Sequence, residues 1–209
     1  MGDIPKIPWP MKGDVPFKEG DFNSMQLHLD WLSTFSLYGD LTIADAFKEA
    51  ADKIIENLEM GNEFRHPDKF FYPIAYLYRH SFELCLKCII NYGIKLDVIK
   101  EDESLDEILR IHNLHKLWNK SRFILEKAWP DGDEETLVNA ERILLKFHAI
   151  DDSGQAFRYS KDIKGNQHLE KAPKRIDLIN LKKVSNNLFS FLDSCINGLS
   201  YFEDCQGYY

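Results

Sequence analysis

The most apolar stretch of the chain spans residues 70–92 and reads FFYPIAYLYRHSFELCLKCIINY. Pro67 and Asp68 precede it and Gly93 follows it, so both ends carry residues that delimit helices. Pro73 falls in the expected first turn, where a missing N–H costs little. Apolar residues cover most of the helical circumference, which is typical of a helix surrounded by others. We therefore expect a central helix in an all-α fold.

Helical periods also flank this stretch. Apolar residues recur at helical spacing in 41–61, from about 113 to 129, in 133–148 and from about 177 onward. In 41–61 we expect an inward stripe made of Ile43, Phe47, Ala50, Ile54 and Leu58. Residues 24–38 fit a short helix, and the acidic stretch 97–107 fits a loop or a short helical turn. Residues 151–174 show no helical period and predict one long loop before the last helix.

The pattern predicts an antiparallel bundle of five to six helices. Residues 1–20 contain four of the eight prolines, which predicts an extended N-terminal arm. Residues 21–209 are then a single helical-bundle domain. The last helix carries a broad apolar stripe, and aromatic residues continue to Tyr208 and Tyr209. Because this exceeds what one bundle face needs, we expect a homodimer.

Composition narrows the function classes. The formal net charge is −8, which argues against broad, non-specific binding to nucleic acid. No apolar run is long enough for a membrane helix, so we expect no membrane partner. The four cysteines do not resemble a disulfide framework, which favours a cytoplasmic location. We expect no metal or other cofactor, because the CxxC pair of Cys85 and Cys88 lies in the middle of an apolar helix.

The central helix also carries charge. Arg79, Glu83 and Lys87 are spaced by four residues and share one helical face. They form either a structural polar seam or a buried cluster in which Glu83 directs Arg79 towards a phosphate. On the second interpretation Arg79 and His80 are candidate catalytic residues, and Glu83 is a candidate binding residue.

Two further segments hold candidate site residues. Asn113 fits a helix cap, and His112 and His115 flank it near a helix end that favours anions. Asp151 opens the long loop, and Arg158 lies between Phe157 and Tyr159, which predicts a fixed direction for its side chain. Asp151 and Arg158 are therefore candidate binding residues, although an aspartate at a helix end is more often a cap.

Three segments resemble the HEPN superfamily of helical bundles: LYRHSFELCLKCIINYGIKL at 77–96, HNLHKLW at 112–118 and FRYS at 157–160. The resemblance covers residues 70–205, approximately. It implies a small, commonly dimeric all-α bundle. Many HEPN domains cleave RNA without a metal in toxin–antitoxin, CRISPR and phage-defence systems, and others are non-catalytic modules for dimerisation or partner binding.

The catalytic signature of that superfamily is an arginine followed a few residues later by a histidine, which act at the RNA 2′-OH and phosphate. Arg110 with His115, and Arg142 with His148, match this spacing, although neither arginine is followed by Asn, Asp or His. The resemblance thus implies catalytic roles for Arg110 and His115. Two hypotheses remain: a metal-independent ribonuclease of a bacterial defence or toxin–antitoxin system, and a non-catalytic module that binds a partner protein or nucleotide.

The two hypotheses share one geometric prediction. We expect Arg79, Glu83, His115 and Arg158 to meet where the central helix, the start of the next long helix and the long loop come together.

Overall fold

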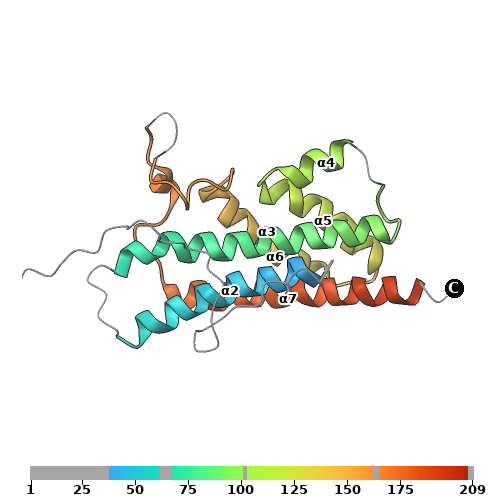
Figure 1. Ribbon diagram of the computed structural model, residues 1–209, viewed down its shortest axis with the longest axis horizontal. Helices are drawn as coiled ribbons and strands as arrows, with labels where there is room; N and C mark the ends of the chain where they lie inside the picture. Colours follow the sequence, from blue (N-terminus) through green and yellow to red (C-terminus); the bar gives the residue numbers. More distant parts are fainter. Residues whose placement is uncertain (1–37, 62–66, 101–102, 162–164, 207–209) are drawn as a thin grey trace, which may run out of the picture. The chain divides into compact units, whose positions relative to one another are not determined.

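The computed structural model describes residues 38–61, 67–100, 103–161 and 165–206, which belong to one unit of the chain. Six α-helices and two short 3-10 helices lie within these residues, and no strand does (Figure 1). The all-α prediction is therefore confirmed. The predicted arm at 1–20 and nearly all of the predicted helix at 24–38 lie outside the described residues.

Helix α3, Phe71–Lys95, is the central element. It follows a 3-10 turn, η1 at Pro67–Phe70, and packs against α2, α5 and α7. Its buried residues lie on every side of the helix, as the nearly continuous apolar sequence predicts. Figure 1 shows α3 running between α2 and α7 on one side and α5 on the other.

Helix α2, Tyr38–Glu59, begins earlier than predicted and buries a different stripe. Its buried apolar residues are Leu41, Ala44, Ala51 and Ile55, whereas Ile43 of the predicted stripe is exposed. Ala44 and Ala51 are fully buried in α2, which packs against α3 and α7, whereas the larger Ile54 and Leu58 are only partly buried. The predicted stripe was therefore wrong in register, although the helix itself is present.

Helix α5 packs against α3, and α4 and α6 pack against α5. Helix α4 spans Glu103–Arg110, so the stretch predicted as a loop or turn ends in two turns of helix. Helix α5, Leu114–Ala128, begins after Asn113, whose side chain accepts a hydrogen bond from the backbone N–H of Lys116 at 3.0 Å. Helix α6, Glu134–Ile150, is capped in the same way by Asp133. Both caps satisfy backbone donors that a helix start leaves unpaired.

The long loop lies between Ile150 and the last helix, α7 at Leu178–Gln206. It contains one 3-10 turn, η2 at His168–Lys171, and an isolated bridge between Lys161 and Gln167. The apolar stripe of α7 packs into the core through Leu188, Leu192, Ile196 and Leu199. None of the described helices combines the length and the apolar composition needed to cross a bilayer.

Candidate functional site

The most deeply buried charges of the described chain surround Arg79. Its side chain is 2% exposed, and the side chains of Glu83 and Asp151 are 1% and 0% exposed. Arg79 Nη1 donates to Glu83 Oε2 at 3.1 Å, and Nε lies 3.2 Å from Asp151 Oδ2. Nε also donates to the Asp151 carbonyl oxygen, and Nη2 donates to that of His112. Arg79 thus ties α3 to the start of α5 and the end of α6.

Glu83 continues this cluster to the protein surface. Its second oxygen, Oε1, accepts a hydrogen bond from Lys87 Nζ at 2.9 Å and lies 2.7 Å from His112 Nδ1. Burial alone would raise the pKa of Glu83, but the hydrogen bonds and charges of Lys87 and His112 lower it below the ordinary value of 4.5. The carboxylate therefore stays charged at neutral pH and orients the His112 ring.

His112 is the member of this cluster that is most open to solvent, since 49% of its side chain is exposed and only 19% of that of Lys87. Because Nδ1 faces the Glu83 carboxylate, this nitrogen carries the ring proton in the neutral imidazole. The Nε2 lone pair is then available to a molecule outside the protein. A carboxylate that fixes the tautomer of a histidine is a common arrangement in general-base catalysis.

The start of the long loop is folded against His112. Asp151 Oδ1 accepts a hydrogen bond from the backbone N–H of Ala156 at 3.0 Å, which closes a tight turn. Gly154 within this turn has φ +77°, a conformation that other residues rarely adopt. A Cβ on Gly154 would lie 3.0 Å from the His112 Cβ and 3.3 Å from Arg79 Nη1. Glycine is therefore needed here for its backbone conformation and for the close contact.

Arg158 leaves this turn towards the aromatic residues of α3. Its Nε donates to the Gly154 carbonyl oxygen at 2.6 Å, and its guanidinium carbon lies 5.9 Å from the ring centroids of both Tyr76 and Tyr159. Tyr76 stacks on His80 with a centroid distance of 5.6 Å. The residues on either side of Arg158 in the sequence differ: Phe157 is buried, whereas Tyr159 is 57% exposed.

His80 occupies a partly buried position on the same helix. The edge of Phe47 from α2 meets its ring at 4.6 Å between centroids. Burial lowers the pKa of His80, and the charges of Lys87 and His112 lower it further against the opposing effect of Glu83. His80 is therefore mostly neutral at neutral pH, and its surroundings favour a packing role.

The predicted meeting of four residues is correct for Arg79 and Glu83 and wrong for His115. The histidine that joins the cluster is His112, and Arg158 reaches it through Gly154. The reason is the cap at Asn113. His112 precedes the helix and folds back onto α3, whereas His115 lies within the first turn, with its ring centroid 6.0 Å from that of His148 on α6.

The two arginine–histidine pairs also separate in the structure. Arg110 is the exposed last residue of α4, and Arg142 is exposed on α6. Within the described residues, neither arginine side chain forms an ion pair or a hydrogen bond. The two histidines, however, lie together, and burial and the charge of His115 lower the pKa of His148. The two histidines of these pairs therefore lie near each other, whereas the two arginines do not lie beside them.

The remaining cysteine motif lies in the core. Cys85 and Cys88 are buried in the middle of α3, and burial raises the pKa of Cys88 to about 12. A thiol must lose its proton to bind zinc, which this environment opposes. No group of three or more metal-binding side chains occurs among the described residues.

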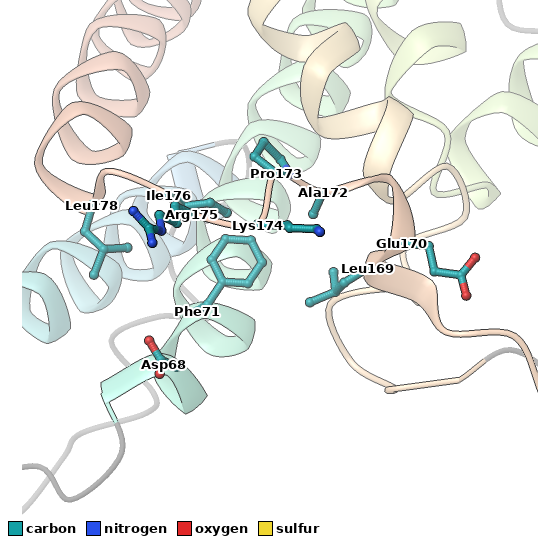
Figure 2. A pocket seen from close by; sticks show the side chains of 10 residues that line it. All are labelled: Asp68, Phe71, Leu169, Glu170, Ala172, Pro173, Lys174, Arg175, Ile176 and Leu178. Atoms are coloured by element: carbon teal, nitrogen blue, oxygen red, sulfur yellow. The ribbon is translucent and has the colours of Figure 1, made fainter.

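Two hollows lie near the starts of α3 and α7. One has a volume of about 710 Å³ and a neighbouring one about 360 Å³. Both are lined by Phe71, Pro173, Arg175 and Ile176, and Figure 2 shows these residues around the first hollow. Neither hollow is lined by His80, His112, His115 or His148.

Comparison with protein-family models, with curated proteins and with solved structures finds no match to this chain. The fold and the site therefore define its class: an all-α bundle with a buried Arg–Glu–Asp cluster that orients one histidine at the surface.

Proposed function

We propose that the chain is a metal-independent ribonuclease, as its resemblance to the HEPN superfamily implies, and that His112 is its general base. The observation that supports this most is the contact between Glu83 Oε1 and His112 Nδ1, 2.7 Å apart, in a histidine whose side chain is 49% exposed. Such a pair holds a neutral histidine in the correct tautomer to accept a proton.

The reaction needs few parts. His112 Nε2 accepts the proton of a ribose 2′-OH, and O2′ forms a bond to the adjacent phosphorus. The bond between phosphorus and O5′ breaks, and the leaving oxygen takes a proton from water. The products are a 2′,3′-cyclic phosphate and a 5′-hydroxyl, and His112 then returns its proton to solvent.

Two cations next to His112 suit an RNA phosphate. Lys87 shares the Glu83 carboxylate with His112 and is partly exposed, and Arg158 is exposed beyond Gly154. Arg158 is thus an exposed cation on a chain whose net charge is −8, whereas the charge of Lys87 is shared with Glu83. In this proposal Arg79 is a positioning residue, because it is buried and its three nitrogens already face protein oxygens.

We expect cleavage of a single-stranded oligonucleotide with one ribonucleotide, in buffer with a chelator. His112→Ala should lower the single-turnover rate by about 100-fold or more, because a positioned general base typically contributes that much. His115→Ala is the matched control, since His115 contacts no carboxylate within the described residues, and its effect should be smaller. Melting curves for both variants check that the fold is kept. Activity that requires a metal, or a larger loss for His115→Ala than for His112→Ala, would contradict the proposal.

Wild-type protein that binds RNA or a partner protein and never cleaves RNA would instead support the non-catalytic module. The roles in bacterial defence or toxin–antitoxin systems and the cytoplasmic location depend on the same proposal and stay predictions.

The homodimer also stays a prediction. Within the α7 stripe on which it was based, Leu188 and Leu199 are buried and Leu181, Phe191 and Phe202 are partly buried against the core, whereas Tyr201 near the end of α7 is 65% exposed. We expect light scattering to give twice the chain mass of 24.4 kDa. The monomer mass across a wide concentration range would reject the homodimer.

A further inference from the structure

We infer that Arg158 and Tyr159, supported by Tyr76, form a stacking subsite for a base of single-stranded RNA beside His112. This inference rests on the proposed function, because it names the substrate class that the site would take. Three observations support it: the geometry of Arg158, the exposure of Tyr159 and the contact of their turn with His112.

Arg158 is held in place by its surroundings. Its guanidinium lies over Tyr76 and Tyr159, and its Nε is bound to the Gly154 carbonyl oxygen. Within the described residues its side chain forms no ion pair. Contacts with two aromatic rings and one backbone oxygen order the side chain without neutralising it. An ordered, unpaired guanidinium is suited to a phosphate or to the face of a base.

Tyr159 offers the second surface. It follows the buried Phe157 by two positions, so the loop is anchored in the core just before this exposed ring. Anchoring limits the conformational freedom that the ring would lose on binding. Proteins that bind single strands use such aromatic rings as platforms, and every base can stack on them.

The subsite adjoins His112, the proposed general base, through Gly154. The Gly154 carbonyl accepts from Arg158, and its Cα side packs against the His112 Cβ. A nucleotide stacked at Arg158 and Tyr159 would thus place its neighbouring phosphate near His112. Single strands fit this arrangement because bases inside an A-form duplex are stacked on one another and are not free to bind a side chain.

The test is RNA binding measured by fluorescence anisotropy with the full chain. A short labelled single-stranded RNA is used, with His112→Ala present in every variant to prevent cleavage. We expect Tyr159→Ala to weaken binding by about 10-fold or more, and Arg158→Ala to weaken it similarly. Tyr159→Phe should bind nearly as well as the parent, since a phenyl ring also stacks. A duplex of the same sequence should bind more weakly than the single strand.

Two matched controls separate stacking from general charge or exposure. Tyr201 is 65% exposed, and Arg175 is an exposed arginine at the hollows of Figure 2. Tyr201→Ala and Arg175→Ala should leave RNA binding unchanged. Equal losses for the controls and the subsite variants, or no RNA binding by the parent, would overturn the subsite.

Failure of the subsite and failure of the proposed function give different results. Normal RNA binding by Tyr159→Ala, together with His112-dependent cleavage by the wild type, would reject the subsite and keep the ribonuclease. Binding that depends on Tyr159, with no cleavage by the wild type, would keep the subsite and reject the ribonuclease.

Discussion

Replacing Arg79 with alanine should lower the free energy of unfolding by about 3–5 kcal/mol, because it leaves the buried Asp151 carboxylate without its cation and removes the ion pair to Glu83 Oε2. Glu83 and Asp151 are both almost fully buried, and Arg79 is the cation that lies between them. The change also removes the hydrogen bonds that hold the start of α5 and the end of α6 to α3. For a chain of this length we expect the melting temperature to fall by roughly 6–20 °C.

Arg122 provides the matched control. It contacts three carboxylates, Glu126, Glu134 and Glu141, but its side chain is 25% exposed. Because water can replace most of these interactions, Arg122→Ala should cost about 1 kcal/mol or less. Thermal and chemical denaturation of the two variants measure the difference. Equal losses of unfolding free energy in the two variants would show that burial does not make the Arg79 cluster more stabilising than the exposed Arg122 cluster.

Local patterns in the sequence were sufficient for most of the fold. The apolar circumference of residues 70–92 predicted the central position of α3, and the Asn113 cap predicted the start of α5. The register of α2 could not be predicted in this way. Its buried face includes Ala44 and Ala51, which add little to an apolar pattern. Which face of a helix is buried is decided by the neighbouring helices, and periodicity alone does not identify them.

Predicting the site would have required knowledge of contacts between residues that are distant in the sequence. Spacing by four residues correctly paired Arg79 with Glu83 on one helix. The contact of Arg79 with Asp151 joins residues 72 positions apart, and that of Glu83 with His112 joins residues 29 apart. The sequence did show that His112 flanks a helix cap. A residue before a cap turns away from the helix axis, and this was the available signal for choosing His112 over His115.

The charge of Glu83 should make stability depend on pH. Its folded pKa is lower than its ordinary value of 4.5, so its contribution is present above that value and is lost as the pH falls through the folded pKa. Arg79, Lys87 and His112 face this carboxylate, and Asp151 lies beyond Arg79. Glu83→Gln keeps the shape and removes the charge. At about pH 7 we expect a loss of about 1–3 kcal/mol, because charged hydrogen bonds are weakened in a buried position.

The test is the difference in the free energy of unfolding between wild type and Glu83→Gln, since the other carboxylates titrate in both proteins. The difference should be present at about pH 7 and should shrink as the pH falls through the folded pKa of Glu83, because Glu83 of the wild type then becomes protonated. Denaturation at several pH values measures it. Glu56→Gln is the control: a hydrogen bond from Lys182 lowers the pKa of Glu56, but that carboxylate is at the surface, so the pH profile should stay close to the wild type. A difference for Glu83→Gln that stays constant down to about pH 2 would mean that Glu83 is not stabilised as a carboxylate, and the orientation of His112 would then need another cause.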